Sequence, residues 1–191
     1  PYRTHWPLLK PRDFAHTERV MSDPGWRAMD AADLAAVVEI SDAVHGRFTE
    51  PAAVYRERLA LYPHGCFVLE RDGAVVGYLV SHPWPRGSSP ELGRPIGAIP
   101  PAADTYYLHD IALLPSARGT GAGRSALTLV ERCARAGGFG DITLTAVGGA
   151  DRYWATQGFA YDREGHAAAY GAGTHRMRKI LPPEDQGRPG A

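Results

Sequence analysis

Three glycines alternate with other residues in the segment ARGTGAGRS, at Gly119, Gly121 and Gly123, between an apolar run and a helical pattern. Glycine has no side chain, so another molecule can approach the backbone closely at these positions. The first N–H groups of a helix have no intrahelical partner and carry the positive end of the helix dipole, which suits them to phosphate groups. The segment is therefore predicted to bind a phosphorylated ligand, because a simple turn needs only one or two glycines.

Three known phosphate-binding patterns can be tested against this spacing. A P-loop would require a glycine where Arg118 stands and a lysine where Arg124 stands. A dinucleotide fingerprint, G-x-G-x-x-G, is one residue longer than the spacing found here. The pattern R-x-x-G-x-G fits residues 118–123, and it predicts a pyrophosphate held by backbone amides with no metal site.

The elements around the glycines are predicted from periodicity and turn signals. A strand over 105–114, a helix over 122–136 and a strand over 141–147 form one right-handed βαβ unit. Two earlier runs, CFVLER and AVVGYLVSH, are joined by Asp72-Gly73 as a hairpin, which makes the sheet mixed. The remaining predicted elements are a strand at 25–29, a helix capped by Asp30, a helix at 51–62, a long loop at 83–104, a short helix at 151–157 and the strands FAYD and THRMRKIL.

The glycine pattern, this order of elements from Trp26 to about Leu181 and the segment DRYWATQGF resemble the GCN5-related N-acetyltransferase (GNAT) superfamily. Within it, LHDIALLPSARGTGAG is similar to the arylalkylamine N-acetyltransferases. The resemblance implies an α/β fold with a central, mostly antiparallel mixed sheet, one splayed parallel βαβ pair and helices on both faces. It also implies acetyl-CoA as co-substrate.

The resemblance places the parts of acetyl-CoA along this sequence. The pantetheine arm would run beside the backbone of Ile111, Ala112 and Leu113, whose side chains are expected in the core. The pyrophosphate would be bound by the backbone of the loop and of the first helical turn, that is by Arg118, Gly119, Thr120, Gly121, Ala122, Gly123 and Arg124.

His109 is the candidate general base, because it lies on the strand that would present the thioester and a neutral imidazole can accept a proton near neutral pH. The arylalkylamine enzymes carry a His-x-His pair here, of which His109 matches the second and Tyr107 replaces the first. The alternative is a strand histidine that only bonds to a neighbour. Asp110 is expected on the opposite face, as a structural acid.

The general acid is where the sequence departs from the superfamily, since Trp154 stands where many members have tyrosine. An indole N–H is no proton source. Tyr153 is adjacent, but one helical residue rotates it by roughly 100°. Three options remain open for the acid: Tyr153, water, or slow transfer without an acid. Trp154 packs either against the acetyl or pantetheine region or in the core.

The acceptor pocket is expected from residues 44–64 and 82–107, with Trp84 and Tyr107 as substrate-binding candidates. Aromatic rings and carboxylates together suit an amine of modest size. The other side chains of this kind in the two segments are Phe48, Tyr55, His82, Glu50 and Glu91.

Composition narrows the class of protein. The 191 residues carry 21 Lys+Arg and 21 Asp+Glu, and this balance argues against nucleic acid as a partner. No apolar run reaches the roughly 20 residues that cross a membrane. The two cysteines, Cys66 and Cys133, are far apart, which favours the cytoplasm. A homodimer is the general expectation for an enzyme of this size.

The domain prediction is an N-terminal extension over 1–23, partly disordered, an N-acetyltransferase domain over 24–181 and a disordered tail over 182–191. The predicted function is acetyl transfer from acetyl-CoA to the primary amine of a small molecule by direct attack. The alternative is a non-catalytic module that binds and senses acyl-CoA. The failed spacings above argue against a third class, a P-loop or dinucleotide enzyme, which binding of ATP or NAD would support.

Overall fold

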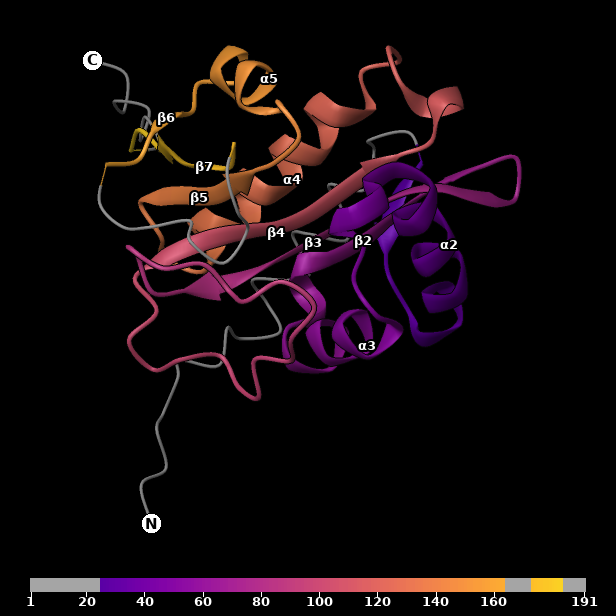
Figure 1. Cartoon of the computed structure of the whole chain (residues 1–191), viewed down its shortest axis with the longest axis horizontal. Helices are drawn as coiled ribbons and strands as arrows, with labels where there is room; N and C mark the ends of the chain where they lie inside the picture. The colour runs from indigo at the N-terminus through magenta and orange to yellow at the C-terminus, as the bar shows by residue number, and fades with distance from the viewer. Residues whose placement is uncertain (1–24, 164–172, 184–191) are drawn as a thin grey trace, which may run out of the picture.

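The computed structural model describes residues 25–163 and 173–183. The predicted extension at 1–23 and all of the predicted tail beyond residue 183 lie outside these residues. One seven-stranded sheet, in the order β1-β2-β3-β4-β5-β7-β6, forms the centre of the domain. Helices α2 and α3 cover one face, and α4 lies against the other (Figure 1).

The observed elements follow the predicted ones closely. They are β1 (Trp26–Ala28), α2 (Leu34–His45), α3 (Ala52–Leu61), β2 (Cys66–Arg71), β3 (Ala74–Trp84), β4 (Thr105–Leu113), α4 (Ala122–Ala136), β5 (Asp141–Ala146), α5 (Asp151–Thr156), β6 (Ala160–Tyr161) and β7 (His175–Ile180). Within the described residues, no helix combines the length and apolar character needed to span a membrane.

Two boundaries differ from the prediction. Asp30 does form a capping box, but it caps a 3-10 turn at 31–33 that precedes α2. Strand β3 continues through Pro83 to Trp84, where a loop was predicted. A proline is tolerated there because β2 pairs with β3 only as far as Val80, so no neighbour on that side needs the missing N–H.

The sheet is antiparallel except between β4 and β5. These two strands are parallel, and they pair only at Tyr106 with Ile142 and at Tyr107 with Thr143. Both strands continue for several residues beyond the last pair. The predicted fold, a mixed sheet with one splayed parallel pair and helices on both faces, is confirmed.

A β-bulge in β4 places the residues of chemical interest. Val80 pairs with Asp110 and Ser81 pairs with Leu108, so His109 is the extra residue of the bulge. A bulge interrupts the alternation of side chains along a strand. His109 and Asp110 consequently both face α2, α3 and their connection, and the prediction that Asp110 points to the opposite face is wrong.

The long loop between β3 and β4 is fastened by carboxylates. Glu50 accepts the backbone N–H of Gly93 at 2.9 Å, and Glu57 accepts those of Ile96 and Gly97 at 2.7 and 2.8 Å. Near the base of the loop, the guanidinium of Arg86 bonds to the buried carboxylate of Asp141. These bonds hold the loop against α3 and beside the α2–α3 connection.

Gly77 of β3 pairs with Leu113 of β4, and it offers a test of the packing between these strands. A Cβ there would lie 2.9 Å from the carbonyl oxygen of Ala112 and 2.6 Å from the side chain of Leu113. We expect Gly77→Ala to lower the free energy of unfolding by about 1–3 kcal/mol in urea denaturation, because the backbone of β4 must shift.

Gly140→Ala is the matched control, since a Cβ at Gly140 meets no atom within 4 Å. Its unfolding free energy should stay within about 0.5 kcal/mol of the unsubstituted protein. Equal effects of the two substitutions would contradict this account of the strand packing.

Candidate active site

One cavity of about 840 Å³ runs along the splayed region of the sheet. One end is lined by the glycine segment, with Arg118, Gly119, Gly121, Gly123 and Arg124. The other end is lined from α2, the α2–α3 connection and the long loop, by Val44, His45, Phe48, Glu50 and Leu92. Residues of β4 and α5 lie between, so a single elongated ligand could contact both ends.

The glycine segment has the features of an anion cradle. Gly119 and Gly121 have φ angles of 72° and 88°, which side chains rarely adopt, and a Cβ at either would point into open space. Gly121 is the N-cap of α4 and provides no side-chain cap, and the first turn holds no acidic residue. The amides of this turn are therefore available to a phosphate group.

The predicted acetyl-CoA residues divide into two groups. Ile111 and Leu113 line the cavity, as do the glycines and arginines above. The side chains of three others are engaged elsewhere: Ala112 packs in the α2–α3 core, Thr120 bonds to Arg71 and Ala117, and Ala122 packs in the core on the α4 side of the sheet. Any contact of these three with a ligand would use their backbone.

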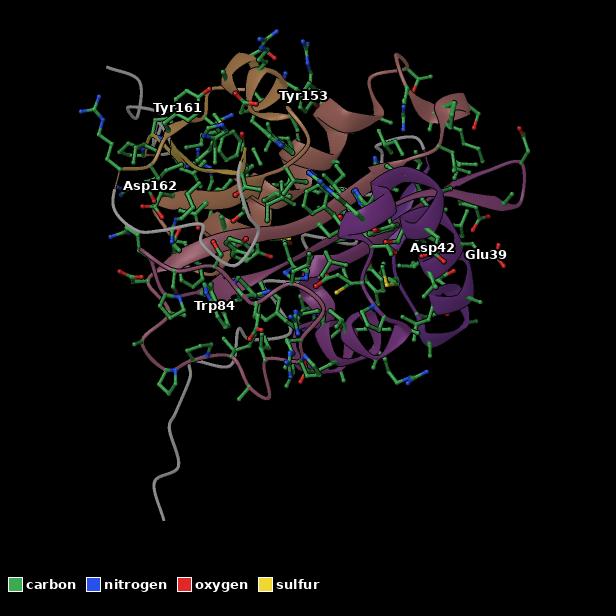
Figure 2. All side chains as sticks on the ribbon, in the orientation of Figure 1. Glu39, Asp42, Trp84, Tyr153, Tyr161 and Asp162 are labelled. Atoms are coloured by element: carbon green, nitrogen blue, oxygen red, sulfur yellow. The ribbon has the colours of Figure 1, made fainter. Side chains whose placement is uncertain are left out.

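Tyr153 and Trp154 lie differently although they are adjacent in α5. Tyr153 is 45% exposed and labelled in Figure 2, and its hydroxyl lies 2.9 Å from where a Cβ on Gly123 would be. Tyr153 thus stands over the glycine segment. Trp154 is 8% exposed and packs edge-on against Phe159, although it also borders the cavity. Burial raises the pKa of Tyr153 above its ordinary value, so its hydroxyl stays protonated.

His109 and Glu50 form a buried pair at the other end. The imidazole Nε2 lies 2.7 Å from Oε2 of Glu50, and the two side chains are 1% and 4% exposed. The second carboxylate oxygen accepts the N–H of Gly93. Glu50 was predicted only as an acid of the acceptor pocket, so its contact with His109 is a finding of the structure.

A second pair, His45 and Asp110, borders the same cavity, and its two atoms Nε2 and Oδ1 are 2.7 Å apart. The other oxygen of Asp110 accepts the hydroxyls of Tyr78 at 2.5 Å and Tyr55 at 3.0 Å. Burial alone would raise the pKa of Asp110, but the hydrogen bond and charge of His45 outweigh it and lower that pKa. Burial and then the charge of Asp110 raise the pKa of both tyrosines.

The two predicted substrate-binding residues do not line the cavity directly. Tyr107 is 1% exposed, and its hydroxyl lies 2.9 Å from Oγ1 of Thr145, which does line it. Trp84 lies at the end of β3, where its ring packs against His82 at 5.6 Å, and Figure 2 shows it far from Tyr153. His45 and Leu92, which do border the cavity, have no motif in the sequence that would single them out.

The pair of His45 and Asp110 predicts a pH dependence of stability. Burial opposes the charge of His45, but the hydrogen bond and attraction of Asp110 outweigh it, so the pKa of His45 is raised above 6.5. A raised folded-state pKa gives stability that is present below the unfolded pKa and is lost as the pH rises through the folded value. We expect His45→Gln to destabilise the protein more in acidic than in alkaline urea denaturations.

His64→Gln is the contrasting control. Burial lowers the pKa of His64, so its contribution should change with pH in the opposite sense. A destabilisation by His45→Gln that does not depend on pH would contradict the assigned ion pair.

Comparisons with known proteins can now be set beside this geometry. The profile of the acetyltransferase (GNAT) family matches residues 34–159, which include the glycine segment and β4. No curated protein matches the sequence significantly.

Solved structures share the fold at low sequence identity. Ard1 from Thermoplasma volcanium superimposes with a TM-score of 0.63 at 15% identity, over 82% of this chain and 97% of its own. The GNAT-like decarboxylase GphF, in complex with isobutyryl-CoA, gives 0.65 at 18%, over 82% and 99%. The N-acetylglutamate synthase from Neisseria gonorrhoeae, complexed with coenzyme A and N-acetyl-glutamate, gives 0.59 at 17%, over 82% and 35%.

The family profile covers most of the chain, and the overall fold is shared with these structures. The protein belongs to the acetyltransferase (GNAT) family.

Proposed function

We propose that the protein transfers an acetyl group from acetyl-CoA to the primary amine of a small molecule, by direct attack of the amine on the thioester. The observation that carries the proposal is the continuity of the cavity. It joins an anion cradle at the start of α4 to the pair of His109 and Glu50.

The chain has residues suited to each part of acetyl-CoA. The amides that follow Gly121 would hold the pyrophosphate. The backbone of Ile111, Ala112 and Leu113 would accompany the pantetheine arm, because β5 does not pair with β4 beyond Tyr107. Acetyl-CoA supplies the activated acyl group, and its thioester would lie near His109, which borders the same cavity.

The acceptor end combines carboxylates with apolar walls. Glu50 and Asp110 would attract an ammonium group, while Val44, Phe48 and Leu92 would contact its apolar part. The ammonium must lose a proton before its nitrogen can attack, and the pair of His109 and Glu50 is placed to accept that proton. The departing thiolate would take a proton from Tyr153 or from water.

Direct attack is favoured because the thiols are poor nucleophiles. Burial raises the pKa of Cys66 to about 12 and that of Cys133 to about 11, so both stay protonated near neutral pH. Neither borders the cavity. Both thiols are free, which supports the proposed cytoplasmic location.

A non-catalytic acyl-CoA sensor is the alternative, and turnover separates it from an enzyme. The sensor would bind acyl-CoA and release no thiol with any amine. The decarboxylase among the similar structures makes release of carbon dioxide from carboxyacyl-CoA thioesters a useful further assay.

Calorimetric titration tests the glycine segment. We expect acetyl-CoA to bind the unsubstituted protein and Gly121→Glu to bind at least about 100-fold more weakly, because a carboxylate would occupy the anion cradle and its positive φ would be strained. ATP and NAD serve as ligand controls. Gly140→Glu, with its Cβ in open space away from the cavity, is the matched variant and should bind normally. Equal binding by both variants would refute the cradle.

Release of coenzyme A thiol with a panel of primary amines tests the base. His109→Ala should lower kcat by about 10²–10⁴-fold, the usual contribution of a general base, while acetyl-CoA still binds. His64→Ala, in the turn that follows α3 and outside the cavity lining, is the histidine control. An active His109→Ala enzyme would remove His109 from the mechanism and leave the cradle unaffected.

A further inference from the structure

Acetyl transfer to a protonated amine produces one proton in each turnover. The balance is R–NH3⁺ plus CH3CO–S–CoA giving CH3CO–NH–R, HS–CoA and H⁺. One proton of the ammonium ends on the thiol, one stays on the amide, and the third must leave the protein before the next cycle. Because the base is buried at the end of the cavity, the protein must give this proton a path to solvent. That such a proton is formed rests on the proposed function.

A continuous row of hydrogen bonds leads from the cavity to the surface. Oδ2 of Asp110 lies 3.0 Å from the hydroxyl of Tyr55, which lies 2.7 Å from Oγ of Ser41. Oγ of Ser41 lies 2.9 Å from Oγ1 of Thr49, and Oγ1 of Thr49 lies 2.6 Å from Oδ1 of Asp42. Asp110 borders the cavity, Tyr55 and Ser41 are 0% exposed, and Asp42 projects from the outer side of α2 (Figure 2).

The count of protons in this row is informative. Four links join the two carboxylates, whereas the hydroxyls of Tyr55, Ser41 and Thr49 bring only three protons. When both carboxylates are ionised, one link has no proton. A single proton arriving at Asp110 fills that link, and all four bonds can then point outward to Asp42.

We propose that Asp110, Tyr55, Ser41, Thr49 and Asp42 form a relay that carries the proton of each turnover from the cavity to solvent. The pair of His109 and Glu50 gives up the proton into the cavity, which Asp110 also borders. Asp110 takes up the proton, with Nε2 of His45 lying 2.7 Å from its Oδ1, and the carboxyl group turns to present it to Tyr55. Each hydroxyl accepts one proton and passes on its own, so that the O–H bond of Thr49 breaks as Asp42 gains a proton. Asp42 then releases it to water.

The surroundings fit a relay of hydroxyls. Burial raises the pKa of Tyr55, so its hydroxyl stays protonated and can both accept and donate a hydrogen bond. Tyr78 donates to the same oxygen of Asp110 at 2.5 Å and steadies the carboxylate as a side branch. The row also crosses three elements, since Ser41 and Asp42 lie on α2, Thr49 in the α2–α3 connection and Tyr55 on α3.

The experiment measures proton release directly. Protein loaded with acetyl-CoA is mixed in a stopped flow with 2-phenylethylamine, spermidine or glucosamine in weak buffer, while a pH-indicator dye and a thiol reagent report the two products. Thr49→Val removes the hydroxyl that links Ser41 to Asp42. Asp42→Asn keeps an oxygen that can accept the hydrogen bond of Thr49, but its amide cannot take up a proton. In both variants we expect proton release to slow by about tenfold or more and to lag behind acetyl transfer in the first turnover.

Two controls separate a relay from a structural role. Thr49→Ser restores the hydroxyl and should restore proton release. Thr128→Val removes a hydroxyl that donates to the carbonyl of Arg124 in α4, away from the relay. Urea denaturation of every variant reports loss of stability independently of the two product signals.

The outcomes are distinct. Normal proton release by Thr49→Val and Asp42→Asn, with acetyl transfer intact, overturns the relay and leaves the proposed function standing. Equal slowing of both products in Thr49→Val and Thr49→Ser also overturns it, because the hydroxyl would not matter. Absence of thiol release by the unsubstituted protein with every amine contradicts the proposed function, and the relay with it.

Discussion

The arrangement of the site depends on one extra residue in β4. If β4 continued its regular alternation, His109 and Asp110 would face opposite sides of the sheet. The bulge brings both to the side of α2 and α3, where Glu50 and His45 complete the two pairs. The same strand loses its pairing with β5 a few residues earlier, so the cavity opens beside the bulge. A pairing defect on each edge of β4 therefore creates the space and aims the side chains into it.

The two ends of the cavity use different physical means. The glycine end relies on backbone amides and a helix terminus, which act on charge without a titrating side chain. The far end relies on two histidine–carboxylate pairs, and the carboxylate of one of them, Glu50, also binds the long loop. The glycine end is built from consecutive residues, whereas the far end is built from segments that are far apart in the sequence. This difference explains why the first end could be predicted and the second could not.

Most of the fold follows from local signals. Apolar periodicity, Asp72-Gly73 and the glycines around α4 predict nearly every element to within two residues, and the R-x-x-G-x-G spacing predicts the cradle because all its parts are consecutive. The bulge at His109 is not visible in sequence, since it is defined by the register of β4 against β3. The contact of His109 with Glu50 joins residues 59 positions apart, and only the packing of the α2–α3 connection brings them together. Aromatic character alone indicated Trp84, which the structure places away from the cavity lining.

The manner in which the long loop is fastened has an evolutionary consequence. Glu50 and Glu57 bind the peptide groups of residues 93, 96 and 97 rather than their side chains. The anchors therefore tolerate changes of residue type along this part of the loop. Leu92 lies next to one anchor and lines the acceptor end. A descendant of this protein could thus remodel its selectivity by substitution at Leu92, while the path of the chain and the placement of the base are retained.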